Sequence, residues 1–171
     1  MHGLGNDYIY VNSSLYPIKN PSAASVKWSN RHKGIGADGL VLIGKSTVAD
    51  FSMRIFNADG SEAMMCGNAS RCIGKFVYEN ALTRKNEISL ETLSGIKRLM
   101  LDVSNNKVKS VTVDMGTPSF YNPQQVATTD GSFHEKEFEV NGTTYYGTYI
   151  CMGNPHLVIW GEDVESVPVQ D

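Results

Sequence analysis

The sequence predicts an α+β fold, in which a strand-rich domain wraps around one central helix and is followed by the start of a second domain. Three observations support this class. Short β-branched or alternating segments outnumber helical patterns, strands and helices do not alternate regularly, and one helical pattern carries a continuous apolar stripe. A doubly wound parallel sheet is therefore disfavoured, because it needs regular alternation of strands and helices.

Six segments in the first two thirds of the chain have the length and composition of β-strands. They are short, and they either are rich in β-branched side chains or alternate apolar with polar residues. The predicted strands are Tyr8–Val11, Leu40–Ile43, Phe51–Phe56, Ile88–Thr92, Leu99–Val103 and Val108–Met115. We therefore expect the first domain to be built mainly on a sheet.

A first helix is predicted over about residues 22–30. Pro21 followed by a serine is a start signal for a helix, because proline is tolerated in the first turn. We expect Ala23, Val26 and Trp28 of this helix to cover part of a core.

A second helix is predicted from a stronger pattern. Apolar side chains recur at i, i+3, i+4, i+7 and i+8, at Ala69, Cys72, Ile73, Phe76 and Val77. This period predicts a helix that is buried along one face. The polar residues expected to lie largely outside the stripe are Ser70, Arg71, Lys75 and Glu79.

A domain boundary is predicted near Met115–Pro118, where the last predicted strand gives way to a polar stretch, which gives domains 1–117 and 118–171. The second domain contains a predicted hairpin over residues 138–150, whose turn is Asn141-Gly142, a pair that favours a type I′ turn. Only about fifty residues follow the boundary, which is short for an independent core. We therefore expect the second domain to be incomplete.

Composition and charge restrict the class of partner. Fifteen basic and eighteen acidic residues give a net charge of −3 and are spread along the chain, which argues against nucleic acid or a membrane surface as the partner. No apolar run reaches the roughly 18 residues of a membrane helix, and no signal peptide is evident. We expect a cytoplasmic protein with a small-molecule partner.

Cysteine usage points to free thiols. Cys66, Cys72 and Cys151 are an odd number, and no pair has the spacing of a zinc site. Neither a disulfide framework nor a metal centre is therefore expected in a reducing compartment.

Candidate chemistry is concentrated between Asn57 and Asn68, where glycines and amides surround Cys66. If a helix begins just after Cys66, unpaired N–H groups and the positive end of the helix dipole stabilise a thiolate and make proton exchange near neutral pH feasible. The N–H groups of Gly67 and Asn68 could then hold a carboxylate and stabilise the enolate-like charge formed when an α-proton leaves. The alternative is that Cys66 is a small buried apolar residue.

Four segments together resemble the diaminopimelate epimerase family. They are Gly3–Asp7, Arg31–Gly39, Asn57–Cys72 and Met152–His156. Each glycine-rich segment alone is a weak signal, but their order and the residues around Cys66 make the resemblance specific. It is loose between Ile88 and Tyr149, so these motifs carry the assignment.

The resemblance implies epimerisation of LL- to meso-diaminopimelate by two thiols, with neither pyridoxal phosphate nor metal, in lysine and peptidoglycan-precursor biosynthesis. It also implies a possible homodimer and a second domain similar to the first. The residues that it assigns are Cys66 as the first catalytic cysteine, Asn6, Asn57 and Asn154 as substrate-binding side chains, Gly67 and Asn68 as a backbone clamp on a carboxylate, and His156 as a histidine that adjusts the thiols. Residue type alone equally allows a turn cap, a loop residue and a structural histidine at positions 57, 154 and 156.

This chain departs from the family pattern in three ways. The second catalytic cysteine, which the family carries in its C-terminal half, is absent, so we expect a fragment that is inactive by itself. Cys72 cannot replace it, because six helical residues place it about 120° around the axis from Cys66, and Cys151 is expected to be a packed core residue. Gly39 stands where some members have a glutamine that contacts substrate, and the short leading strand is missing.

Other functions remain open at the level of sequence. Proline racemase-like enzymes have Gly-His after the first cysteine, whereas Asn68 occupies the second position here, and phenazine-biosynthesis-like isomerases generally lack the thiol. A cysteine hydrolase would need a histidine base, and no local signature links His2, His32 or His156 to Cys66. A half-site that binds part of a ligand without turnover is a further alternative.

Overall fold

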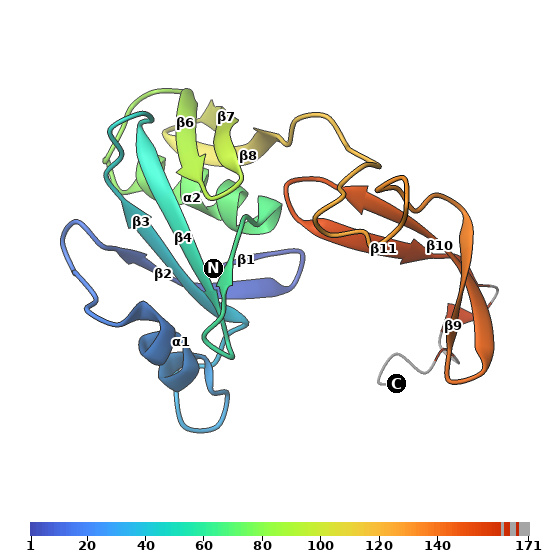
Figure 1. Cartoon of the computed structure of the whole chain (residues 1–171). Coiled ribbons are helices and arrows are strands. Elements are labelled where there is room, and N and C mark those ends of the chain that lie inside the picture. The colour runs from blue at the N-terminus through green and yellow to red at the C-terminus, as the bar shows by residue number, and fades with distance from the viewer. Residues whose placement is uncertain (162, 165–166, 168–171) are drawn as a thin grey trace. The chain divides into compact units, whose positions relative to one another are not determined.

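The computed structural model describes residues 1–161, 163, 164 and 167. The chain divides into two compact units, Met1–Met115 and Gly116–Asp171 (Figure 1). The bounds predicted from sequence, 1–117 and 118–171, are nearly the same. Each unit is built on a sheet of its own. Among the described residues, neither helix combines the length and the apolar character needed to cross a bilayer.

The first unit contains an eight-stranded mixed sheet. Its strands are β1 (His2–Gly3), β2 (Asn6–Asn12), β3 (Gly39–Gly44), β4 (Phe51–Asn57), β5 (Glu62–Ala63), β6 (Glu87–Thr92), β7 (Gly95–Ser104) and β8 (Lys107–Asp114). They lie in the order β1-β2-β3-β4-β6-β7-β8, with β5 paired to β4, and the β2–β3 and β4–β6 pairs are parallel. This strand-rich mixed sheet confirms the predicted α+β class.

All six strands predicted for this unit are present, and two were missed. The missed strands, β1 and β5, have only two residues each, which is too short to produce an alternating pattern. The β1 strand pairs with β2 through His2 opposite Asp7 and Gly3 opposite Asn6. The N-terminal segment is therefore part of the sheet, and it bends back on itself just before the predicted substrate residue Asn6.

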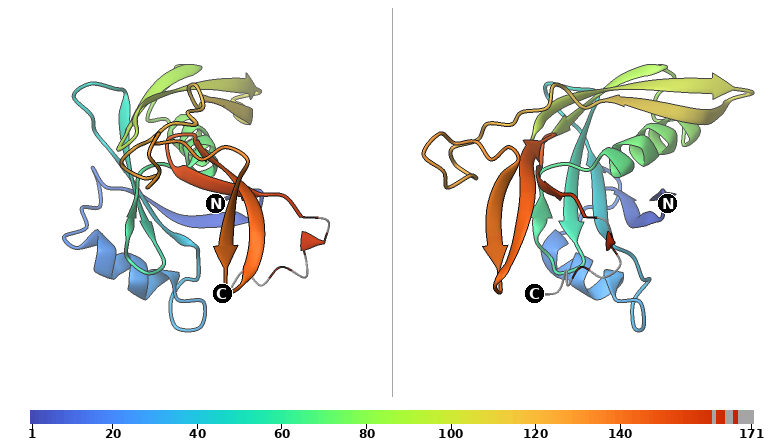
Figure 2. Two further views of the ribbon diagram at one scale, coloured as in Figure 1. Left: turned by 45° about the vertical axis from the view of Figure 1, so that its right-hand side comes forward. Right: turned by 90° about the vertical axis from the view of Figure 1, so that its right-hand side faces the viewer.

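Helix α2 (Gly67–Glu79) lies against the sheet and forms the centre of its core (Figure 2). The predicted stripe is confirmed, since Ala69, Cys72, Ile73 and Val77 are buried while Phe76 is partly buried. The residues that surround it come from six strands and include Tyr8, Val41, Ile43, Met53, Ile55, Ile88, Leu90, Leu99, Leu101 and Val108. The expectation of a sheet that wraps around one helix therefore holds.

One residue of α2 departs from the predicted pattern. Ser70 was expected to lie largely outside the stripe, but it is fully buried. Its hydroxyl donates a hydrogen bond of 2.9 Å to the carbonyl oxygen of Cys66, which satisfies the polar group inside the helix itself. A serine can be buried here because this local bond replaces its bond to water.

Helix α1 (Pro21–Ser29) begins as predicted, but its buried face differs from the prediction. The side chain of Asn20 caps the helix by accepting a hydrogen bond from the backbone of Ala23. Ala23 and Val26 are exposed, Val26 by 48%, whereas Ser25 is fully buried. The prediction is therefore wrong for Ala23 and Val26 and holds for Trp28, because the face that meets the sheet also carries serines.

The reason lies in what α1 contacts. Ser25 Oγ lies 2.9 Å from the carbonyl oxygen of Phe56 and 2.8 Å from that of Asn57, at the end of β4. Trp28 is the one residue of the predicted face that packs inward, against a cluster that contains Leu40 and Phe56. Alternate residues of β3 thus face α1 and α2, so β3 is buried on both faces.

The second unit contains a three-stranded antiparallel sheet of β9 (Lys136–Val140), β10 (Thr143–Cys151) and β11 (Pro155–Ile159). The predicted hairpin is confirmed by the β9–β10 pairing. Asn141 and Gly142 have φ of 50° and 79°, the positive values that a type I′ turn requires. The β11 strand was not predicted because it begins at Pro155, and a proline lowers the expectation of a strand.

Candidate active site

Cys66 is the N-cap residue of α2, as the sequence predicts. Its backbone is extended, with φ of −144°, and the helix begins at Gly67. The Sγ atom accepts a hydrogen bond of 3.5 Å from the backbone N–H of Ala69. The sulfur therefore lies at the positive end of the helix dipole. The side chain is partly buried, so neighbouring residues hold it in place while part of it stays accessible to solvent.

Asn6 and Asn68 lie beside this sulfur. The Cys66 thiol donates a hydrogen bond of 3.5 Å to Asn6 Oδ1, and Asn68 Nδ2 donates one of 3.4 Å to the same oxygen. Asn6 is the first residue of β2, sixty residues before Cys66, so the sheet brings them together. Four of the residues predicted from sequence, Asn6, Cys66, Gly67 and Asn68, thus form one cluster.

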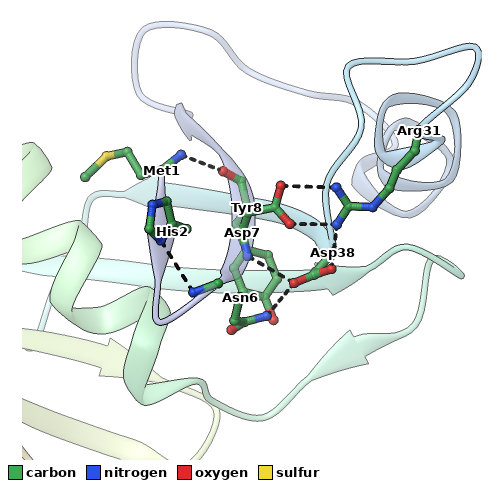
Figure 3. Close-up of polar contacts among 8 residues, drawn as sticks. Met1, His2, Asn6, Asp7, Tyr8, Arg31 and Asp38 are labelled. Carbon is green, nitrogen blue, oxygen red and sulfur yellow. Dashed lines mark hydrogen bonds and ion pairs between the residues drawn. The ribbon is translucent and has the colours of Figure 1, made fainter.

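A charged group supports Asn6 from its other side (Figure 3). Asp38 Oδ2 accepts hydrogen bonds from Asn6 Nδ2 at 2.8 Å and from the backbone N–H of Asp7 at 3.0 Å. Arg31 Nη2 in turn lies 2.9 Å from Asp38 Oδ1 and 2.7 Å from Asp7 Oδ1. The Arg31 guanidinium holds the pKa of Asp7 below its usual value.

Sequence reasoning missed these supporting residues. Arg31 and Asp38 fall within a segment that carries the family resemblance, and Asp7 directly follows Asn6. That signal marked the segments as important, but it did not indicate which side chains meet.

Tyr8 borders the same cluster and is nearly fully buried. Burial raises its pKa, a hydrogen bond with Asn6 acts in the opposite direction, and the adjacent Cys66 raises the pKa further. The hydroxyl therefore stays protonated at neutral pH. The Cys66 sulfur thus lies among neutral amide and hydroxyl groups.

Cys72 is buried and lies about one and a half turns further along α2 than Cys66. It lies beside Tyr10, whose pKa is raised by burial and by the neighbouring thiol. Of the two thiols on α2, Cys66 is therefore the more exposed.

Asn57, a predicted substrate residue, ends β4 and takes part in a turn. Its side-chain Nδ2 donates a hydrogen bond of 3.0 Å to Ser61 Oγ, and its backbone N–H donates one of 2.8 Å to the Ser61 carbonyl. Asp59 tightens the turn by accepting from the Ser61 backbone at 2.8 Å. These contacts fit the turn-cap interpretation, and the binding role of Asn57 stays a prediction.

Gly39 pairs with Asn57 in the sheet and has no space for a side chain. A Cβ atom at this position would lie 2.2 Å from the carbonyl oxygen of Phe56, far inside van der Waals contact. The glutamine that some family members carry could not be added here unless β4 moved. The position of the β4 backbone therefore excludes a side chain at residue 39, so a side-chain contact with substrate cannot be made from there.

Asn154, His156 and Cys151 belong to the second unit. Asn154 lies in the turn between β10 and β11, where its carbonyl accepts a hydrogen bond of 3.1 Å from Met152, and His156 is exposed opposite Ile150. The roles predicted for Asn154 and His156 stay predictions. Cys151, expected to be a packed core residue, is only partly buried, because it is the last residue of β10.

The family model described as diaminopimelate epimerase matches residues 1–121, which include this whole cluster. The chain belongs to the diaminopimelate epimerase family. It is 62% identical over 167 residues to the diaminopimelate epimerase of Phocaeicola vulgatus, a match that covers 98% of this chain and 60% of that protein. The diaminopimelate epimerase of Parabacteroides distasonis is 59% identical, with 98% and 58% covered. The chain thus spans about three fifths of the length of these relatives.

Solved structures of more distant proteins have the same fold as this member of the diaminopimelate epimerase family. A hydroxyproline epimerase from Agrobacterium vitis gives a TM-score of 0.64 at 17% identity, with 92% of this chain and 49% of that chain covered. A PhzF-family phenazine biosynthesis protein from Bacillus anthracis gives 0.59 at 20% identity, with 93% and 51% covered. At these identities the likeness concerns the fold alone.

Proposed function

We propose that Cys66 is one of two thiols that interconvert LL- and meso-diaminopimelate without a cofactor. The observation that carries this proposal is the position of its sulfur at the N-cap of α2, between the backbone N–H of Ala69 and the side chain of Asn6. The names of the similar proteins support the choice of substrate. Because the chain spans about three fifths of their length, the proposal concerns the activity of the whole protein.

The proposed step is a proton transfer at the α-carbon. The Cys66 thiolate takes the α-proton, so an S–H bond forms as the C–H bond breaks and its electron pair moves into the α-carboxylate. The backbone N–H groups of Gly67 and Asn68, at the start of α2, are suited to stabilise that charge. A thiol on the opposite face then gives a proton to the carbon, which inverts its configuration.

The second thiol is not supplied by α2. Cys72 is buried and lies six helical residues from Cys66, about 120° around the axis, so the two sulfurs do not flank one carbon. We propose that residues 1–171 alone hold one half of the thiol pair and do not epimerise. In the whole protein, Asn57 and Asn154 would add to substrate binding and His156 would adjust the protonation of the thiols. Cytoplasmic location and homodimer formation stay expectations.

A cysteine hydrolase is less well supported. Such an enzyme needs a base within hydrogen-bond reach of the thiol. Within the described part of the chain, the groups beside the Cys66 sulfur are the amide oxygen of Asn6, the backbone N–H of Ala69 and the Tyr8 hydroxyl, and none of them is a general base. The contacts of this sulfur favour proton exchange with a bound carbon acid.

Alkylation of the thiols tests whether Cys66 lines the substrate site. We predict that iodoacetamide labels Cys66 and that LL-diaminopimelate slows this labelling, because substrate bound against the sulfur excludes the reagent. Peptide mass spectrometry separates the three cysteines, and the buried Cys72 serves as the internal control whose slow labelling should not respond. An identical rate of Cys66 labelling with and without substrate would count against the proposed site.

A further inference from the structure

A chain of side-chain hydrogen bonds, in which donor and acceptor groups alternate, runs through the cluster around Cys66. It runs from Arg31 through Asp38, Asn6 and Asn68 to Arg71. The charged groups at its two ends come from different parts of the first unit. Arg31 lies in the loop after α1, whereas Arg71 lies in the first turns of α2.

The charged ends determine which way both amides point. An ionised carboxylate only accepts hydrogen bonds, so Asp38 requires the Nδ2 group of Asn6, at 2.8 Å, to face it. A guanidinium only donates, so Arg71 requires the Oδ1 atom of Asn68 to face it. The remaining atoms then match, since Asn68 Nδ2 faces Asn6 Oδ1. A reversed Asn6 amide would bring its NH₂ group against that of Asn68.

We propose that Asp38, held by Arg31, is a positioning residue that turns the Asn6 amide so that its oxygen faces the Cys66 thiol. Asp38 does not touch Cys66 and acts only through Asn6. Arg31 keeps the Asp38 carboxylate in place through its other oxygen, Oδ1, which leaves Oδ2 for Asn6.

The direction of the Asn6 amide bears on both protonation states of the sulfur. Asn6 Oδ1 accepts the S–H proton, while the Ala69 N–H donates to the same sulfur. With both bonds present, the sulfur can give up a proton and also take one back. A reversed amide would present N–H groups to the sulfur and would favour the thiolate alone. The consequence for turnover rests on the proposed function, but the orientation of Asn6 does not.

The chain offers a matched control for the charge of Asp38. Asp7 is a second carboxylate on the same Arg31, and its side-chain oxygens contact that guanidinium, whereas Asp38 also binds the Asn6 amide. Asp7→Asn and Asp38→Asn therefore remove the same charge from the same cluster. Only Asp38→Asn places an amide against Asn6. Because the Arg31 guanidinium only donates, this amide turns its oxygen toward Arg31 and its NH₂ group toward Asn6.

The first readout is the side-chain amide signal of Asn6 in a nitrogen-15 NMR spectrum of this chain, assigned by its loss in Asn6→Ala. A proton bound to a carboxylate resonates downfield, because charge-assisted hydrogen bonds are the stronger ones. We expect Asp38→Asn to move this signal upfield, because the bond to a carboxylate is lost, and Asp7→Asn to leave it close to its wild-type position, because the bond to Asp38 stays. Equal shifts in the two variants would overturn the proposal.

The second readout is the rate of Cys66 alkylation at pH 7, resolved by mass spectrometry. We expect Asp38→Asn to raise it about threefold or more, because N–H groups turned toward the sulfur increase the thiolate fraction. Asp7→Asn should leave the rate within about a factor of 1.5 of the wild type, as it leaves the Asn6 bond intact. An unchanged rate in a folded Asp38→Asn chain would contradict the positioning role. Neither readout uses turnover, so failure of the proposed function would not affect them.

Discussion

The Cys66 sulfur has one hydrogen-bond partner that donates and one that accepts, and the two come from different parts of the sequence. The donor, the N–H of Ala69, belongs to the same helix start and follows from local sequence, so the N-cap position could be predicted. The acceptor, Asn6, comes from sixty residues away, and the residue that supports it, Asp38, from another segment again. Sequence alone marked Asn6 through family resemblance but gave no means of placing Asp38 against it.

At the scale of single residues, Arg31 is predicted to control the titration of Asp7. The hydrogen bond from Arg31 is the largest cause that lowers the pKa of Asp7. A carboxyl group with a depressed folded pKa contributes stability above its unfolded pKa, and this contribution is lost as the pH falls through the folded value. We therefore expect Arg31→Met to raise the pKa of Asp7 toward its ordinary value.

This shift can be followed by NMR titration of the Asp7 carboxyl carbon between neutral and acid pH. The Asp50 carboxyl is a suitable reference, because its pKa is lowered by a different cation, Lys85, and then by the backbone of Ser89. It should titrate alike in Arg31→Met and in the wild type. If the Asp7 titration does not move in the variant, the cause assigned to its depressed pKa is wrong.

At the scale of elements, the two helices differ in how far sequence could predict them. The stripe of α2 was predicted almost completely, because a helix packed inside a curved sheet buries apolar residues at a regular period. The buried face of α1 was predicted correctly only for Trp28, because the helix also docks through Ser25 onto backbone carbonyls. Apolar periodicity cannot reveal contacts made by buried polar side chains.

We expect Ser25→Ala to destabilise the first unit by about 1–3 kcal/mol, because it removes a buried hydrogen-bond donor and leaves carbonyl groups without it. The same change should increase hydrogen exchange in α1 and at Asn57, where β4 ends. Urea denaturation followed by tryptophan fluorescence measures the first effect, since Trp28 lies on α1. Ser110→Ala, at an exposed position on β8, is the control and should change stability by less than about 0.5 kcal/mol. A Ser25→Ala variant as stable as this control would show that the bond to β4 does not hold α1.

At the scale of the whole molecule, the cluster around Cys66 belongs to one unit and two other predicted residues, Asn154 and His156, belong to the other. The strand content and the mixed class were predictable, because β-branched segments mark most of the long strands. The strand β11, which carries His156, was not predicted from the sequence. This strand begins with Pro155 and the polar His156, so only three apolar residues remain to mark it as a strand.

The account depends on proton abstraction by Cys66, and deuterium exchange tests this most directly. LL-diaminopimelate in deuterated water would be followed by proton NMR with a full-length protein that contains residues 1–171, and with its Cys66→Ala variant. We predict loss of the α-proton signal and appearance of the meso form with the unmodified protein, and neither with the variant, whose helix α2 stays folded by circular dichroism. Exchange at a near-normal rate in the folded Cys66→Ala variant would contradict the assignment of Cys66 as a base.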